Sequence, residues 1–532
     1  MRIKLMSLHF KFQKMKNYIN IQLRLRILFL VFIAAVFNSC TKEFDERNTD
    51  PTAVTVLSPT DLKGLFPNAQ WQGVALGGGT QYQRGVNAFA DLYAQYFAVT
   101  QTSFASDRFD LTQARLQNHW IRSYVFTMPS LLTIIKQTQT PETKPLNAIA
   151  RIWKVFSLMR ITDYYGPVPY FKIGSTEKTI PYDSQKDIYY DFFKELTEAS
   201  ADLKNNIALP GYGSQDLIYN GDNAKWLKFA NTLRLRLALR ISNVDAAKAK
   251  AEAEAAVANG VMTAVTDDAY MKVDPARPNA LGFISAWNEF RMSQTMESFL
   301  KGYDDPRLSS YFQPAVSDKQ YRGLRNGMIP AQIVLPENGY NNASNLNDRF
   351  TPVKMNTEPM TVIRSGEAYF LRAEGAVNGW NMGGTAADLY AKGIEMSLRT
   401  NGITDAVVIN NYINSTNLPS APGGYFNTPA ISDIPVKFST DPVKQREQIG
   451  TQKWLALFPD GQEAWAEVRR SGFPKRYNVI NSDNPDVPVG KFVRRIVFLE
   501  YDKDRNGQAV KDAVALLGGP DKASTPLWWD KN

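Results

Sequence analysis

Helical periodicity that recurs in pairs of segments is the feature that most constrains how this chain folds. The clearest pair begins with residues 223–240, where Trp226, Leu233 and Leu237 fall on one face of a helix. An Ala-rich second segment comes after a short polar turn and ends at Gly260, a residue type that typically follows the last turn of a helix. A pair of this length, close to 40 residues, is typical of stacked helix hairpins such as tetratricopeptide repeats.

Three further pairs share this pattern, near residues 85–136, 145–204 and 364–402. Together with the pair at 222–260 they predict a mainly α fold of about four tetratricopeptide-like hairpins. The region near 261–360 is rich in Gly, Pro, Asn and aromatic residues and lacks helical periodicity, and long loops of this kind are usually functional. No Ser/Gly-rich or highly charged linker separates the hairpins, so we expect one domain over residues 61–532.

A basic leader precedes the helical part. Residues 27–37 form an uncharged apolar run of signal-peptide length, too short for a spanning helix of about 20 residues. The run is followed directly by Asn38, Ser39 and Cys40, the only cysteine of the chain, which suits lipid attachment to that thiol. We therefore expect a lipoprotein signal peptide over residues 1–39, lipidation of Cys40 and a tether over residues 40–60.

The positive charge of the chain lies mainly in this leader. The formal net charge is +9, but seven Lys and Arg and no acidic residue precede Cys40, so the remainder carries only +2. A nucleic-acid-binding protein carries its positive charge on the folded domain, so no nucleic-acid partner is expected.

Residue counts also argue against common enzyme classes. His119 is the only histidine after the leader, which excludes the usual His-based metal clusters and Ser-His-Asp triads, and we expect no enzymatic activity. Asp502, Asp504 and Asn506, followed by glycine, match the first half of a calcium loop. Position 12 of that loop is Ala513 instead of a bidentate glutamate, so a polar turn is favoured over a calcium site and no other cofactor is expected.

Several short motifs occur in one order along the chain and resemble the SusD/RagB family of outer-membrane lipoproteins of Bacteroidota. After the lipidation site they are Asp163-Tyr-Tyr-Gly-Pro-Val-Pro169, Asp305-Pro-Arg-Leu308, Glu367-Ala-Tyr-Phe-Leu-Arg-Ala-Glu374, Gln452-Lys-Trp-Leu-Ala-Leu457, Glu463-Ala-Trp465 with Arg469-Arg-Ser-Gly-Phe-Pro474, and Trp528-Trp-Asp530. From the residues alone, the carboxylates and arginines of the third and fifth motifs indicate ion pairs inside an aromatic core.

The resemblance implies four tetratricopeptide-like units in a protein anchored to the outer membrane through the lipid on Cys40 and facing the cell exterior. Such a protein is expected to bind a glycan, or a peptide as in RagB-like relatives, and to act as the lid of a SusC-type TonB-dependent transporter. An adaptor that uses its helical repeats only to hold a partner is the alternative from a different class.

Aromatic residues in the irregular regions are the candidates for contact with a sugar, because pyranose rings stack on flat aromatic faces while amide and charged groups bond the hydroxyls. The long irregular region offers Trp287, Asn288, Arg291 and Tyr303, followed by Tyr321 and Arg322. A second candidate segment near the N-terminus holds Trp71, Tyr82 and the stretch from Phe104 to Phe109. Packing in the core is the competing interpretation for each of them, since the chain has 63 aromatic residues.

Overall fold

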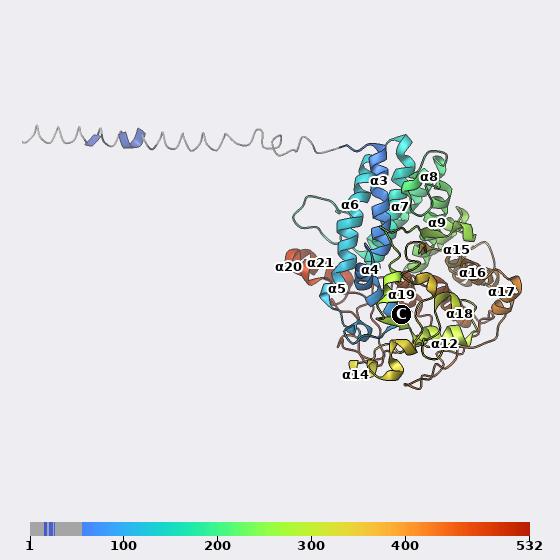
Figure 1. The fold of residues 1–532 in the computed structure, drawn as a ribbon. Coiled ribbons are helices and arrows are strands. Elements are labelled where there is room, and N and C mark those ends of the chain that lie inside the picture. Colours follow the sequence, from blue (N-terminus) through green and yellow to red (C-terminus); the bar gives the residue numbers. More distant parts are fainter. Residues whose placement is uncertain (1–14, 17, 19–20, 25, 27–55) are drawn as a thin grey trace, which may run out of the picture. The chain divides into compact units, whose positions relative to one another are not determined.

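Helices that are consecutive in the chain pack against one another through most of the computed structural model (Figure 1). The structure describes residues 15, 16, 18, 21–24, 26 and 56–532, and it divides into two units, residues 1–57 and 58–532. In the first unit the described positions between 15 and 26 are helical, whereas Cys40 and the apolar run at 27–37 lie outside the described residues. Within the described parts of the chain, no helix combines the length and the hydropathy that crossing a membrane requires.

Three helix pairs occupy the ranges where periodicity predicts them. They are α7 (Lys144–Tyr165) with α8 (Gln185–Asn205), α9 (Asn223–Arg240) with α10 (Ala246–Ala258), and α15 (Ser365–Val377) with α16 (Ala386–Thr400). Local chemistry sets their ends: the Asp222 side chain caps α9 by accepting from the backbone N–H of Ala224 and Lys225, and Gly260 behind α10 has a φ of 95°. The prediction of a mainly α fold built from helix hairpins is confirmed.

The N-terminal hairpin differs from the expected pair at 85–136. That range begins within the π-helix η1 (Gln83–Asp91), which follows α4 (Gly79–Tyr82). It continues through β1 (Phe97–Val99), η2 (Ala105–Arg108), α5 (Gln113–Ile121) and the π-helix η3 (Arg122–Thr127) into α6 (Met128–Gln137). The helix beside α6 is α3 (Pro59–Ala75), which periodicity does not predict (Figure 1). Its buried face carries Gln70, Gln72 and Gly73, so α3 lacks the apolar periodicity that reveals a helix.

The region expected to be irregular, near 261–360, contains only short elements. Besides four short 3-10 helices, they are β2 (Ala269–Met271), α11 (Leu281–Ala286), β3 (Phe290–Met292), α12 (Gln294–Gly302), α13 (Leu308–Tyr311), α14 (Pro330–Ile333) and β4 (Met360–Ile363). Strand β2 pairs antiparallel with β4, and β3 pairs antiparallel with β1 (Phe97–Val99).

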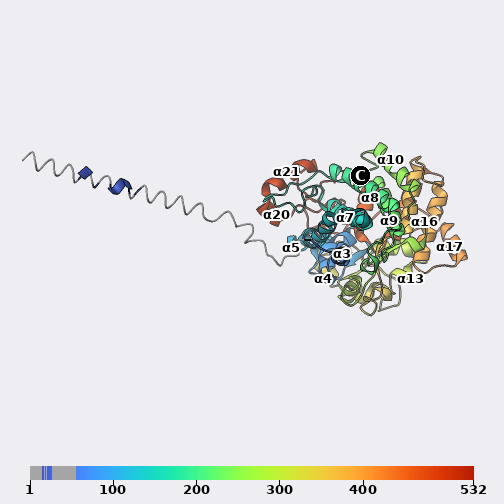
Figure 2. The same ribbon diagram turned by 90° about the horizontal axis from the view of Figure 1, so that it is seen from above.

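The C-terminal part adds α17 (Ala406–Ile413), α18 (Pro442–Leu457), α19 (Gly461–Ser471), α20 (Glu500–Arg505) and α21 (Gly507–Leu517). Both views place α20 and α21 at one end of the second unit and α16 and α17 at the other (Figures 1 and 2).

Buried ion pairs connect the hairpins to α19. Arg236 of α9 donates two hydrogen bonds of 2.6 Å to Glu367 of α15, and Arg240 donates at 2.5 Å to Glu463 of α19. All four side chains are at most 5% exposed. A buried ion of this kind is tolerated only when its partner and hydrogen bonds are in place, so these pairs fix how the helices meet. The ion pairs that the motifs indicated are therefore present.

Candidate functional site

Strand pairing brings the two predicted ligand-binding segments together. In the β1–β3 ladder, Ala98 lies opposite Arg291, although almost 200 residues separate them in the chain. Beyond the ladder, the Thr100 hydroxyl donates to the carbonyl oxygen of Asn288 at 2.6 Å. The N-terminal segment and the turn that holds Trp287 and Asn288 therefore form one surface.

A run of three glycines lies at the centre of this surface. Gly77 and Gly78 have φ angles of 86° and 117°, a region that residues with a side chain rarely adopt. A Cβ on Gly79 would lie 2.6 Å from the Phe283 ring, and one on Gly78 would lie 3.8 Å from the Trp71 ring. The Phe283 ring in turn lies 5.8 Å from that of Trp287. We call Trp71, Gly77–Gly79, Phe283 and Trp287 the aromatic surface.

The rings of the aromatic surface keep part of their area open. Trp71, Phe283 and Trp287 are all half-buried, and the indole Nε1 of Trp71 has no hydrogen-bond partner among the described residues. Next to the glycines, Gln83 begins the π-helix η1 and donates to the Glu289 carboxylate. Burial raises the pKa of Glu289, while Gln83 and the Arg115 charge oppose that rise. The surface thus combines aromatic faces with amide and carboxylate groups, which is what sugar hydroxyls require.

Asn288 and Arg291 support each other beside the aromatic surface. Arg291 Nη2 donates to Asn288 Oδ1 at 2.5 Å and its Nε donates to the Tyr340 carbonyl at 3.0 Å. Arg291 is 4% exposed, and burial lowers its pKa to about 10. Asn288 has a left-handed φ of 55° that this bond helps to hold. Of the two, only the half-buried Asn288 offers polar atoms near the open surface.

Tyr303 lies apart from this surface, in the core. It is 2% exposed, its ring packs 5.7 Å from that of Phe299, and its hydroxyl donates to the Ile434 carbonyl at 2.9 Å. The core interpretation holds for Tyr303, because neither its ring face nor its hydroxyl is open.

Arg322, next to the half-buried Tyr321, borders a separate polar cavity of about 230 Å³. Arg322 pairs with Asp318, and Tyr425 on the cavity wall is 52% exposed. Tyr82 and Phe104, from the N-terminal candidate segment, are both buried. None of these residues belongs to the aromatic surface.

The predicted calcium residues lie on a helix in the structure. Asp502 and Asp504 belong to α20 and Asn506 follows it, whereas a calcium loop holds its first ligands on a non-helical turn. Asp502 accepts a hydrogen bond from the Tyr182 hydroxyl, and Asn506 Nδ2 donates to the Ile180 carbonyl at 3.0 Å. The described residues contain no group of three or more His, Cys, Asp or Glu side chains suited to a metal ion. The expectation of no cofactor, with calcium as the weaker alternative, stays an untested prediction.

His119 does not offer acid–base chemistry at neutral pH. It is 2% exposed, and its ring packs edge-on at 4.6 Å against Tyr164. Burial and the nearby charge of Arg160 lower its pKa to about 3, so the imidazole is neutral at pH 7.

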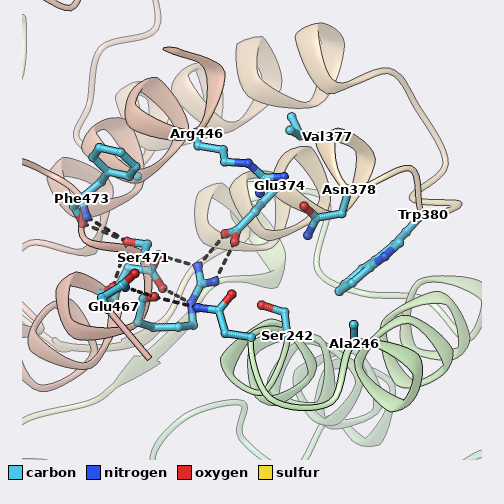
Figure 3. Close-up of a pocket in the computed structure, with 14 residues that line it drawn as sticks. Ser242, Ala246, Glu374, Val377, Asn378, Trp380, Arg446, Glu467, Ser471 and Phe473 are labelled. Atoms are coloured by element: carbon cyan, nitrogen blue, oxygen red, sulfur yellow. Dashed lines mark hydrogen bonds and ion pairs between the residues drawn. The ribbon is translucent and has the colours of Figure 1, made fainter. Parts of the chain in front are cut away.

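A cavity of about 590 Å³ lies between the ends of α9, α15, α18 and α19 (Figure 3). Its floor is a saturated ion cluster: Arg470 donates to both oxygens of Glu374 at 2.7 and 2.6 Å and to Glu467 at 2.7 Å. Lys453 lies 2.8 Å from Glu467 and 3.4 Å from Glu374. We call this cavity the paired pocket, because its two buried cations face two buried carboxylates.

Trp380 was not predicted as a ligand-contacting residue, although it lines the paired pocket. It lies at the opposite end of the cavity from Phe473, with Asn378 beside it (Figure 3). It comes directly after Gly379, whose φ is 76°, in the turn that ends α15. The sequence signal for a surface position of Trp380 was its place directly after Asn-Gly at a helix end, because such turns lie on the surface.

The comparisons with known proteins agree on one family. The model of the family described as "SusD-like: Susd and RagB outer membrane lipoprotein" matches residues 47–530. Curated protein sequences gave no significant match.

Among solved structures, a chitin-binding SusD homolog from Flavobacterium johnsoniae is 34% identical over 89% of this chain and 99% of its own, with a TM-score of 0.82. SusD homologs from Bacteroides uniformis and Bacteroides thetaiotaomicron are 31% and 30% identical, each over 88% of this chain and 99% of their own, with TM-scores of 0.80. The chain therefore belongs to the SusD-like family of outer-membrane lipoproteins.

Proposed function

We propose that this protein is lipidated on Cys40, faces the cell exterior and binds a glycan that it passes to a SusC-type TonB-dependent transporter, for which it acts as a lid. Membership of an outer-membrane lipoprotein family supports the anchor, together with a cysteine directly behind an apolar run of 11 residues. The 34% identical relative described as chitin-binding supports a glycan ligand.

The observation that carries the glycan proposal is the aromatic surface. Three half-buried rings from two distant segments, Trp71, Phe283 and Trp287, lie around the glycine turn, in which Gly79 leaves the room that the Phe283 ring occupies. Aromatic faces bind the apolar side of a pyranose, while Asn288 and Glu289 are placed to bond its hydroxyl or acetamide groups. Chitin oligosaccharides are therefore the first ligands to test.

The test compares two tryptophans of similar burial in different places. We expect Trp287→Ala to weaken the binding of chitin hexaose by at least about tenfold in isothermal titration calorimetry, with only a small change in melting temperature. The matched control is Trp380→Ala in the paired pocket, which should bind as the wild type does. Equal loss in both variants, or none in Trp287→Ala and Trp71→Ala, would remove the aromatic surface from the proposal.

The same assay separates the alternatives. A RagB-like protein would bind peptides but would show no binding of chitin oligosaccharides, and an adaptor would bind neither ligand. Incubation with the oligosaccharides followed by product analysis should show no shortened sugars, because the protein is proposed to bind its ligand and not to cleave it.

The transporter partnership is tested on the lipidated protein in its native membrane. Purification in mild detergent should recover a large outer-membrane β-barrel in stoichiometric amount, identified by mass spectrometry. Recovery of the protein alone in repeated gentle preparations would argue against the lid role. Cys40→Ser should release the protein from the membrane fraction, since lipid chains supply stable attachment.

A further inference from the structure

A second cavity of about 590 Å³ shares Asn532 with the paired pocket and is lined by several arginines. Arg469, Arg476 and Arg494 line it, with Lys491 at its exposed rim. We call it the arginine pocket. It shares no residue with the aromatic surface, so its chemistry is independent of the proposed glycan site.

Arg469 is buried and forms no ion pair with a carboxylate of the described residues. It is 2% exposed, and its guanidinium lies 3.7 Å from the centre of the Trp465 ring. Its hydrogen bonds go to neutral carbonyl oxygens, those of Asp163 at 2.8 Å, Arg494 at 2.9 Å and Trp465 at 3.1 Å. Its Nη2 has no hydrogen-bond partner among the described residues. A buried cation with an unused donor is costly unless something else bonds it.

Arg476 has similar partners, although it is half-buried. Its guanidinium lies 4.1 Å from the centre of the Phe492 ring, and Nη1 donates to the Tyr93 carbonyl at 2.7 Å. No carboxylate of the described residues forms an ion pair with Arg476 or with Arg469. The charge of Asp530 acts on both Arg469 and Arg476, but both of its carboxylate oxygens accept hydrogen bonds from Arg494.

The remaining acid on the wall is Asp486, which pairs with Lys522 at 2.7 Å. Among the described side chains, Asp530 is therefore the carboxylate whose charge all three arginines share, and its hydrogen bonds go to Arg494.

The electrostatic consequence appears in the pKa values. Burial and the charges of Arg494 and Arg469 lower the pKa of Arg476 to about 9. Burial, with Arg240 and Arg494, lowers the pKa of Arg469 to about 10, although Asp530 and Asp163 oppose that change. The positive charges destabilise one another, and an anion placed among them would relieve this repulsion.

We infer that the arginine pocket binds an oxyanion, a phosphate or a sulfate group. Guanidinium groups present paired N–H donors that match the oxygens of such a group, and the half-buried Arg476 uses one of its donors on the Tyr93 carbonyl and keeps a solvent-facing side. The cavity has room for more than the anion itself, because pockets of about 300–1,000 Å³ typically enclose whole small molecules. The oxyanion can therefore arrive as a free ion or as a substituent of a sugar.

The experiment measures thermal stability and binding at constant ionic strength, with chloride replaced stepwise by the probe. The probes are inorganic phosphate, inorganic sulfate, N-acetylglucosamine 6-sulfate and uncharged N-acetylglucosamine. We expect at least one charged probe to raise the melting temperature of the wild type by about 2 °C or more. Since phosphate and sulfate also stabilise proteins by exclusion from their surface, the decisive quantity is the difference between variants.

Arg476→Gln is the variant that isolates the site, because it removes a half-buried charge without breaking an ion pair among the described residues. It should lower affinity for the charged probe at least about tenfold in calorimetry. Lys491→Gln, at the exposed rim, should lower the affinity for the charged probe by less. This variant tests the site if Arg476→Gln folds poorly. Arg446→Gln is the matched control: an exposed arginine of the paired pocket, whose loss should leave the response unchanged.

The arms of the test also identify the source of the oxyanion. Tighter binding of the sugar sulfate than of inorganic sulfate assigns the pocket to a charged glycan, whereas equal binding assigns it to the free ion, and both support the inference. Lack of any specific response in the wild type, or a response that Arg476→Gln and Lys491→Gln retain in full, would overturn it.

Discussion

Two neighbouring arginines at the end of α19 have opposite surroundings. Arg470 lines the paired pocket, where the carboxylates of Glu374 and Glu467 accept hydrogen bonds from it at 2.6–3.1 Å. Arg469 lines the arginine pocket, and among the described residues its guanidinium bonds carbonyl oxygens and packs on the rings of Trp465 and Trp529. Both are 2% exposed. The difference teaches that burial alone does not tell whether a charge is structural: what matters is whether the protein supplies its counter-charge.

This contrast separates stability from function. A buried cation whose carboxylates are fixed in place contributes to how helices meet, and its surroundings leave little for a ligand to gain. A buried cation that lacks a carboxylate leaves the counter-charge to be supplied from outside. Substitutions in the two pockets and changes of pH test the contrast, with effects that should decrease from Arg470 to Arg446.

Arg470→Met should give the largest loss of stability. It would leave the buried carboxylates of Glu374 and Glu467 with Lys453 as their shared partner, and breaking a buried pair by removing one member typically costs about 3–5 kcal/mol. Urea unfolding at pH 7 measures the change. Arg470→Lys keeps the charge but loses the paired N–H donors of the guanidinium, so its free energy of unfolding should lie between those of Arg470→Met and the wild type. A loss below about 1 kcal/mol for Arg470→Met would show that the cluster does not hold α15 against α19.

Acidification should give the second-largest loss of stability, through the ion cluster of the paired pocket. Burial would raise the pKa of Glu467, but Arg470 and Lys453 outweigh it and hold that pKa at about 2, below the ordinary value of 4.5. A lowered folded-state pKa contributes stability above pH 4.5 and loses it as the pH falls toward 2. Between pH 7 and pH 3 we expect Glu467 to account for about 2 kcal/mol of the lost stability.

Glu467→Gln is the control for this acid dependence. The variant should be less stable at pH 7 but should lose less on acidification, so the two unfolding curves approach each other as the pH falls. Parallel pH dependence of the wild type and the variant would contradict the lowered pKa of Glu467.

How far the sequence predicts these regions depends on the range of the contacts. Helix hairpins such as α9–α10 were predictable, because the spacing of Trp226, Leu233 and Leu237 within one segment indicates an apolar helix face without information from the rest of the chain. The helix α3 was missed because Gln70 and Gln72 are buried in it; Gln70 Nε2 donates at 2.8 Å to Asp216, far away in the chain. A buried amide looks like a surface residue until its partner is known.

The candidate site was predictable in pieces. Trp71 and Trp287 are both predicted ligand contacts, but their common surface depends on the β1–β3 pairing. Strands of three residues are too short to show an alternating pattern in the sequence, so this pairing could not be predicted. Tyr303 stood in the same irregular region as Trp287 and belongs to the core, because the carbonyl that accepts its hydroxyl is at Ile434. The same limit applies to Arg469 and Arg470: identical side chains, adjacent in the chain, whose partners come from distant segments.

Arg469→Met should cost less than the same change at Arg470. No carboxylate is left without its cation, but the carbonyl oxygens of Asp163 and Arg494 each lose a charged donor, and we expect about 1–2 kcal/mol in urea unfolding at pH 7. The loss should shrink when phosphate or sulfate is absent, because the wild type then also lacks its counter-charge. A larger loss than that of Arg470→Met would reverse the contrast between the two pockets.

Arg446→Gln should change stability least, and it separates the effect of burial from the effect of lacking a carboxylate partner. Arg446 lines the paired pocket and, like Arg469, forms no ion pair with a described residue, but its side chain is exposed to water. Water solvates its charge in the folded and the unfolded state alike, so we expect a change within about 0.5 kcal/mol and no change in its dependence on salt. If Arg446→Gln were as costly as Arg469→Met, the absence of a carboxylate would be sufficient by itself. If it is neutral, as expected, the cost and the demand for an anion arise only where a charge is both buried and without a carboxylate partner.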